Sequence, residues 1–296
     1  MIQPYRKKKF LWEWRTEGTS IFIDPIKPTR LAVLSDIHVP FHDTYAIKLA
    51  LQVCREARPD IVVLAGDLID FYAISKFDRS PERRLLLADE IEQTKHLIES
   101  IHATLKEKRV QMWICMEGNH EARLRYYIWR HAMELSGLQE LQLSNLLGIS
   151  QLKDFVYLER QIYPQSATRD VVPCIKVGNL LIMHGDRIST TGIAVNAPLN
   201  VFRRLLINAL IGHYHRADHY VQCDYEGKPK GCWINPCLCL PRPQFDAGRV
   251  WIQGMSIVEV NVDGFFRVEI LPFIRTNGKI VAFWSNREFS VRVKEG

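Results

Sequence analysis

The sequence has 296 residues, 47% of them hydrophobic and 24% charged, which predicts a globular chain with a sizeable core. No apolar run approaches the ~20 residues that span a bilayer, and the basic start "MIQPYRKKKF" has no apolar stretch behind it, so we expect a cytoplasmic protein without a membrane anchor or signal peptide. The net charge of +6 favours an anionic substrate such as a phosphate ester and is compatible with nucleic acid.

The first 29 residues are predicted to form an N-terminal arm or an edge strand. They combine basic and aromatic side chains: Lys7, Lys8, Lys9, Phe10, Trp12 and Trp14. This composition fits either an aromatic flap packed on the core or a contact with nucleic acid, and we favour the packed flap.

Buried strands and helices alternate through the first half of the chain. Residues 30–36, 60–67 and 110–119 are continuously apolar, as central parallel strands are. Residues 44–58 and 81–108 carry apolar side chains at helical spacing; the stripe of the second helix is Leu87, Ile91, Thr94, Ile98, Ile101 and Leu105. The alternation predicts an α/β sheet with right-handed crossovers.

Short β segments dominate the second half. Seven of them lie between residues 154 and 274, separated by Gly, Pro and Asp, and one helix near 198–208 interrupts them. Residues 1–296 contain no internal repeat and no linker-like change of composition. We therefore expect a single α/β domain with a two-sheet β-sandwich core flanked by helices, its motifs lying within residues 30–271.

The seven cysteines do not form a disulfide framework, because their number is odd and their spacing irregular. A zinc site is conceivable at Cys223, Cys232, Cys237 and Cys239. Their spacing matches no paired C-x-x-C pattern, so we interpret them as small buried hydrophobic residues.

Ligand-type side chains follow the predicted strands. They are Asp36 and His38, Asp67 and Asp70, Asn119 and His120, then His184, His213 and His215. Ligand crevices of open α/β sheets lie beyond the carboxyl ends of the strands, and these donor types suit Mn²⁺, Fe or Zn²⁺. In "GHYH" (212–215) the two histidines lie one residue apart, so an extended backbone would point both rings to the same side. The other histidines are interpreted as structural: His42, His96, His102, His131 and His219.

Five short motifs occur in a fixed order: "SDIHVP", "GDLID", "GNHE", "MHGD" and "GHYH". Together they resemble the blocks of the calcineurin-like metallophosphoesterase superfamily, D-x-H, G-D-x-x-D, G-N-H-[DE], H and G-H-x-H, over residues 34 to 215. The resemblance implies a four-layer fold and two divalent metal ions, most simply Mn²⁺, with Fe or Zn²⁺ as alternatives. It assigns Asp36, His38 and His215 to one ion, Asn119, His184 and His213 to the other, and Asp67 to both.

The same resemblance implies a reaction. A hydroxide bridging the two ions would attack phosphorus, and His120, oriented by Asp70, would serve the leaving group. The alternative for His120 is a supporting role beside the ligands. Arg123 lies one helical turn beyond His120, where it would either grip a phosphate oxygen or pair with Glu121 or Glu134.

The motifs depart from those of the protein serine/threonine phosphatases, since the arginines of G-D-x-x-D-R-G and R-G-N-H-E are missing. The chain is more similar to bacterial and phage members near the nuclease and phosphodiesterase branches. A basic loop at 75–84 and the helix "EARLRYYIWRH" lead us to expect a phosphodiester of a nucleotide or nucleic acid as substrate. The alternatives are a phosphomonoesterase acting on a small metabolite or phosphoprotein, and a catalytically silent metal-binding scaffold.

Overall fold

The computed structural model describes residues 12–76, 85–106, 110–162, 170–188, 196–242 and 251–294. The basic residues 7–9, Phe10 and most of the basic loop at 75–84 lie outside these ranges. The described strands form a six-stranded sheet, a seven-stranded sheet and a small three-stranded sheet.

The six-stranded sheet contains the strands predicted in the first half of the chain. Its order is β13 (Phe266–Pro272), β12 (Gly254–Val260), β3 (Thr29–Leu34), β4 (Ile61–Ala65), β5 (Met112–Met116) and β6 (Phe155–Leu158), with β3 to β6 parallel. The central strands β4 and β5 are continuously apolar because both faces of the sheet are buried there. In β4, Val62 and Leu64 belong to one apolar cluster while Ile61 and Val63 belong to another.

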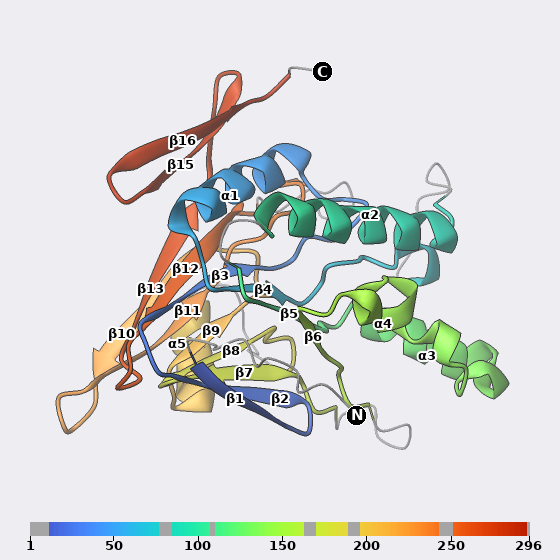
Figure 1. Cartoon of the computed structure of the whole chain (residues 1–296), viewed down its shortest axis with the longest axis horizontal. Helices are drawn as coiled ribbons and strands as arrows, with labels where there is room; N and C mark the ends of the chain where they lie inside the picture. Colours follow the sequence, from blue (N-terminus) through green and yellow to red (C-terminus); the bar gives the residue numbers. More distant parts are fainter. Residues whose placement is uncertain are drawn as a thin grey trace, which may run out of the picture.

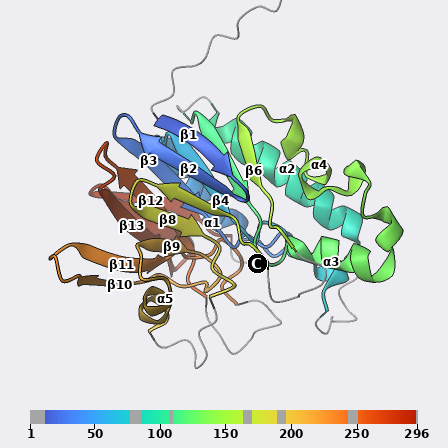
Figure 2. The ribbon, with the colours of Figure 1, turned by 90° about the horizontal axis from the view of Figure 1, so that it is seen from below.

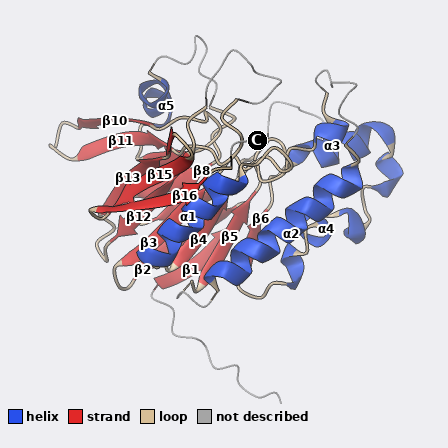
Figure 3. Ribbon diagram, turned by 90° about the horizontal axis from the view of Figure 1, so that it is seen from above, coloured by secondary structure: helices blue, strands red, loops and turns tan. Residues whose placement is uncertain are grey.

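Helices α1 (Thr44–Ala57) and α2 (Leu87–Leu105) cover the outer face of this sheet (Figures 1 and 3). Asp43 caps α1 by accepting hydrogen bonds from the amides of Tyr45 and Ala46. The predicted stripe of α2 is present, with Thr94, Ile98, Ile101 and Leu105 buried and Leu87 and Ile91 partly buried. The α2 helix begins at Leu87, later than the predicted start at residue 81; residues 77–84 lie outside the described ranges.

The seven-stranded sheet lies against the inner face of the six-stranded sheet. Its order is β1 (Trp12–Glu17), β2 (Ser20–Pro25), β7 (Cys174–Val177), β8 (Leu180–Met183), β9 (Ala209–Ile211), β11 (Pro229–Ile234) and β10 (Asp218–Cys223). The apolar layer between the sheets includes Ile21, Ile175 and Leu210. On the far face, α5 (Ala197–Leu205) packs through Val201 and Phe202. The order helix, sheet, sheet, helix confirms the predicted four-layer α/β fold (Figures 1 and 2).

Residues 12–25 form the β1–β2 hairpin, with β1 as an edge strand of the seven-stranded sheet. Trp12 is 2% exposed and packs in the layer between the sheets, while Trp14 is 41% exposed. The described part of the N-terminal segment is therefore an edge strand rather than a free arm.

A third sheet follows the region in which the motifs were expected. It consists of β14 (Ile274–Thr276), β15 (Lys279–Trp284) and β16 (Arg287–Arg292), all antiparallel. Ile280, Ala282 and Trp284 complete the apolar cluster around α1, which this sheet covers (Figure 1).

Short helical segments complete the described chain. They are α3 (Ala122–His131), α4 (Leu143–Leu146) and the 3₁₀ turns η1 (Tyr72–Ile74), η2 (Met133–Leu135), η3 (Gln139–Leu141) and η4 (Ile149–Gln151). No helix of the described residues is long and apolar enough to cross a membrane.

All seven cysteines lie in the described ranges as free thiols. Cys232, Cys237 and Cys239 are buried, as interpreted from the sequence. Cys223 is exposed, contrary to that interpretation, because it ends β10, the edge strand of its sheet.

Candidate metal centre

The loops that follow five strands meet at one edge of the two sheets. Each loop brings ligand-type side chains: Asp36 and His38 after β3, Asp67 and Asp70 after β4, Asn119 and His120 after β5, His184 after β8, and His213 and His215 after β9. Asn119, His120 and His213 are half-buried, and the other six are buried. The structure thus gathers every ligand-type residue singled out in the sequence.

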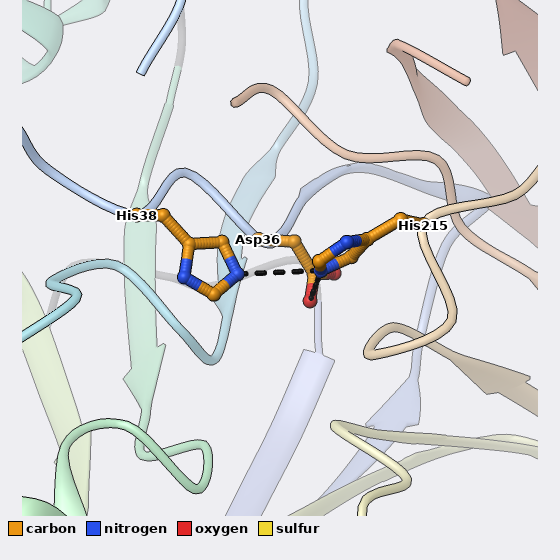
Figure 4. A group of neighbouring side chains, drawn as sticks. All are labelled: Asp36, His38 and His215. Atoms are coloured by element: carbon orange, nitrogen blue, oxygen red, sulfur yellow. Dashed lines mark hydrogen bonds and ion pairs between the residues drawn. The ribbon is translucent and has the colours of Figure 1, made fainter. Parts of the chain in front are cut away.

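One group consists of Asp36, His38 and His215, whose donor atoms lie close enough together to hold a single ion (Figure 4). The Nε2 atom of His215 lies 3.1 Å from Asp36 Oδ1 and 3.2 Å from the Nε2 atom of His38. Two imidazole nitrogens that face each other at this distance cannot both be unprotonated acceptors without a cation or a proton between them.

A second group consists of Asp67, His184 and His213. The Nε2 atom of His184 lies 3.1 Å from Asp67 Oδ2 and 3.1 Å from the side-chain oxygen of Asn119. On the other side of the ring, His184 Nδ1 donates to the carbonyl of Ala65 at 3.1 Å, which directs the Nε2 lone pair into the site.

The Asp67 carboxylate reaches both groups. Its Oδ2 atom, 3.1 Å from His184 of the second group, is also 3.7 Å from the Nε2 atom of His38 in the first. Its Oδ1 atom accepts a hydrogen bond from the backbone N–H of His120 at 2.9 Å, which fixes the carboxylate plane. One carboxylate therefore lies between two sets of donors.

A third group consists of Asp70, His38 and His120. Its Oδ2 atom lies 3.1 Å from His38 Nδ1 and 3.2 Å from His120 Nδ1. Arg123 donates to the backbone carbonyl of Asp70 at 2.8 Å, pairs with its carboxylate at 3.3 Å, and lies 3.0 Å from His120 Nε2. Asp70 thus orients a ligand-type histidine as well as His120.

An ion pair of Arg123 with Glu121 or Glu134 was one of two alternatives from the sequence, and in the structure Arg123 pairs with Asp70 instead. Glu121 is turned away from Arg123 because its carboxylate accepts hydrogen bonds from the backbone amides of Asp67 and Gly118. Asp70 lies just before η1, and its carbonyl is within hydrogen-bond distance of the Arg123 guanidinium in the first turn of α3.

The expectation that His213 and His215 lie on an extended backbone is wrong. Strand β9 ends at Ile211, and both histidines are left-handed, with φ of 69° and 53°. The turn sends the two rings apart, His213 toward His184 and His215 toward His38, and Asp36 accepts from the backbone N–H of His213 at 3.0 Å. Left-handed backbone also occurs at Asp36, His38 and Asp67.

Glycines precede three of the ligand-type residues because the backbone there touches another ligand-type side chain. A Cβ atom on Gly66 would lie 2.6 Å from His184 Nδ1, and one on Gly212 would lie 2.8 Å from Asp36 Oδ2. A Cβ atom on Gly118 would overlap Asp67 Oδ1. The glycines of "GD", "GN" and "GH" are therefore required by close packing around the centre.

The electrostatics keep the carboxylates ionised. Burial raises the pKa of Asp36, but the charges of His215 and His184 outweigh it and bring that pKa to about 2. Burial lowers the pKa of His184, but Asp67 and Asp36 outweigh it and raise that pKa to about 10. Burial and the charge of His184 together lower the pKa of His213 to about 4.

The donors fit divalent cations. Two buried carboxylates, an amide oxygen and four imidazoles form a nitrogen and oxygen set of the kind that Mn²⁺, Fe and Zn²⁺ accept. Among the described residues, the buried Nδ1 atom of His213 has no hydrogen-bond partner. The two buried carboxylates, Asp36 and Asp67, offset part of the charge that divalent cations would bring to the site.

Two residues at the centre were not recognised in the sequence. Glu121, 3% exposed, binds the amides of Asp67, Leu68 and Gly118, and burial together with the Asp67 charge raises its pKa to about 7. The available signal was its position as the last residue of the "GNHE" motif. The ring of Trp251 lies 4.0 Å from that of His215, and nothing in its local sequence indicated this contact.

Two packed sheets with two groups of candidate metal ligands at their strand ends are the architecture of the metallophosphoesterase class. The model of the family described as calcineurin-like phosphoesterase matches residues 29–227, and the chain belongs to that family.

The chain is similar in sequence to a phage protein and in structure to two solved proteins. The Gene 54 protein of Mycobacterium phage D29 is 25% identical over 256 residues, covering 83% of this chain and 94% of the phage protein. Vps29 of Chaetomium thermophilum has a TM-score of 0.43 and 10% identity, covering 89% of this chain and 95% of its own. PhoD has a TM-score of 0.45 and 9% identity, covering 93% and 74% respectively.

Proposed function

We propose that this chain is a phosphoesterase that uses two divalent metal ions, with Mn²⁺ as the expected pair. Asp36, His38 and His215 would hold one ion, and the other would be held by Asn119, His184 and His213. The observation that carries the proposal is the position of Asp67, whose Oδ2 atom lies within 3.7 Å of both groups. When bound, the ions supply Lewis acidity, holding phosphate oxygens and lowering the pKa of bound water.

His120 is proposed as the general acid for the leaving group. Burial lowers its pKa, but the charges of Asp67 and Asp70 outweigh burial and raise it. The Nδ1 atom lies 3.0 Å from the Asp70 carbonyl, so a proton there is held by Asp70 while Nε2 faces the centre. When the ring carries a proton on both nitrogens, it can keep the Nδ1 proton on Asp70 and deliver the Nε2 proton to a departing alkoxide, with the Arg123 N–H that lies 3.0 Å from Nε2 turned to a phosphate oxygen.

Arg123 is proposed to bind a phosphate oxygen. Its guanidinium is anchored through one terminal nitrogen to Asp70, and its other terminal nitrogen lies 3.0 Å from His120 Nε2. A phosphate placed beside His120 would therefore meet an N–H donor whose position is already fixed. Charge-assisted hydrogen bonds of this kind are stronger than neutral ones.

A phosphodiester of a nucleotide or nucleic acid is the proposed substrate. The net charge of +6 supports an anionic substrate. Helix α3 starts directly beyond His120 and carries Tyr127, 42% exposed, and Tyr126, whose ring lies 5.7 Å from the Arg130 guanidinium. Aromatic and cationic side chains in alternation suit bases and phosphates.

A substrate panel tests the proposal. Protein loaded with Mn²⁺ is assayed on bis-p-nitrophenyl phosphate, p-nitrophenyl phosphate, cyclic nucleotides and single-stranded DNA. We expect turnover of the diesters to exceed that of the monoester, whereas turnover of the monoester alone would indicate a phosphomonoesterase. Absence of turnover on every substrate with metal bound would show that the chain is a silent scaffold.

Ligand variants test the metal assignment. His215→Ala and Asp67→Asn each remove a donor, so both metal content and rate should fall. His96→Ala is the matched control, because His96 is an exposed histidine on α2 paired with Glu92 and Glu99. Normal metal content in Asp67→Asn would contradict the shared carboxylate.

A further inference from the structure

The backbone around Trp251 is fixed beside the metal centre. The N–H of Trp251 donates to the carbonyl of Pro241 at 2.9 Å, and the N–H of Ile252 donates to the carbonyl of His215 at 3.0 Å. The indole is thus attached to the same stretch of backbone that positions His215.

The indole of Trp251 forms a wall of the centre on the His215 side. Its ring is 4.0 Å from the His215 ring at 69°, and 6.4 Å from the His38 ring at 33°. Trp251 is half-buried, so part of it reaches solvent.

The opposite side of the centre carries the ion pair of Arg123 and Asp70. His38 separates the two sides, since its Nε2 atom faces His215 and its Nδ1 atom faces Asp70, to which Arg123 is paired. A phosphate bound between these sides meets Arg123 in one direction and an indole in the other. An ester arm that leaves the phosphate toward His215 would therefore contact an aromatic surface.

We propose that Trp251 is a specificity-determining residue that stacks against the nucleobase of the substrate. The inference rests on the proposed function and extends it, because it names the part of the substrate that the chain recognises apart from phosphate. Every nucleobase presents a flat π face. An indole at this position would therefore select nucleotides over aliphatic phosphate esters without selecting one base.

Binding of two ligands that differ only in the base tests this role. Adenosine 5′-monophosphate and ribose 5-phosphate are titrated calorimetrically into protein loaded with Mn²⁺. A stacked base is expected to give the nucleotide an advantage of ~10-fold in Kd. Trp251→Leu should remove that advantage and leave the Kd of ribose 5-phosphate unchanged, while Trp251→Phe should retain several-fold preference. Quenching of indole fluorescence by the nucleotide, lost in both variants, provides a second readout.

Trp14→Leu is the matched control, because Trp14 is 41% exposed on the edge strand β1 and should leave both affinities unchanged. Equal weakening of both ligands by Trp251→Leu, or loss of metal from that variant, would assign the indole to shielding His215 and overturn the proposal. Equal affinity of the unmodified protein for the two ligands, or failure to bind either, would overturn it as well. The proposed function is judged separately, from turnover in the substrate panel.

Discussion

His120 lies outside the Asp36 group and the Asp67 group, and shares the third group with Asp70 and His38. Its Nε2 atom is 3.8 Å from Asp67 Oδ2, and its ring is held through Nδ1 by Asp70. We expect His120→Ala to keep near-normal metal content while turnover falls ~10²–10⁴-fold, the range for loss of a general acid. Metal analysis and steady-state kinetics on the same preparation measure the two effects, and an empty centre in this variant would make His120 a ligand instead.

The Glu121 carboxylate binds the backbone of the loops after β4 and β5, which carry Asp67 and Asn119. Its two oxygens accept from the backbone amides of Asp67, Leu68, Ile69 and Gly118. Glu121→Gln turns one acceptor into a donor that faces N–H groups, so we expect a loss of ~1–3 kcal/mol in the free energy of unfolding. Because the loops carrying Asp67 and Asn119 shift, metal affinity should also fall, as measured by titration with Mn²⁺.

Glu90→Gln is the control for this prediction. Glu90 is an equally buried glutamate whose oxygens accept from the amides of Tyr72 and Ala73, which follow Asp70 in the chain and carry no ligand-type side chain. We expect it to lose stability with metal affinity retained. An equal loss of affinity in both variants would mean that Glu121 has no particular role at the centre.

The sequence predicted which residues gather but not how their backbone does it. The ligand-type residues at strand ends could be recognised in the sequence, because a polar residue stands out after a continuously apolar strand. The left-handed conformations of His213 and His215 were not visible, since neither residue type requires positive φ. The Trp251 contact joins two residues that lie far apart in the sequence, which local patterns do not report.

At the scale of elements, the turn between β5 and α3 is packed against the loop after β4. Gly118 lies at this contact, where an added Cβ atom would overlap Asp67 Oδ1. We expect Gly118→Ala to displace the Asp67 carboxylate, lowering metal content and activity at least as strongly as Asp67→Asn does. Elemental analysis and the diester assay measure this outcome.

Gly137→Ala serves as the comparison, because an added Cβ atom on Gly137 would meet nothing within 4 Å and its φ is not positive. This variant should match the unmodified protein in metal content and rate. Full metal content in Gly118→Ala would show that the loops can separate without loss of the site.

Elements with a repeating pattern were predicted and those held by tertiary packing were not. Strands β3, β4 and β5 were read from continuous apolar runs, and α2 from its stripe. The third sheet lies beyond the last β segment predicted from the sequence, although residues 280–284 of β15 are continuously apolar. It packs on α1 rather than in the sandwich of the two larger sheets. Ser285 and Asn286, both at positive φ, form the two-residue turn that could have indicated the hairpin.

At the scale of the whole molecule, the third sheet stabilises the fold without reaching the centre. Trp284 is 8% exposed in the cluster around α1, whereas its neighbour Phe283 is 56% exposed. Trp284→Ala should cost ~3–5 kcal/mol of unfolding free energy, the range for a large buried aromatic, and leave metal affinity unchanged. Urea unfolding with metal titration measures both quantities, and Phe283→Ala should change neither by much. Loss of affinity in Trp284→Ala would couple the third sheet to the centre.

The left-handed residues have a consequence for the molecule as a whole. Asp36, His38, Asp67, His213 and His215 all adopt a backbone conformation that costs a non-glycine residue about 1–2 kcal/mol. Their sum is comparable with the net stability of an ordinary domain. Left-handed backbone is therefore concentrated at the edge that carries the candidate metal centre, and other interactions of the described chain must offset its cost. Substitutions that relax the backbone at these five positions should raise the stability of the fold, and they would remove candidate metal ligands at the same time.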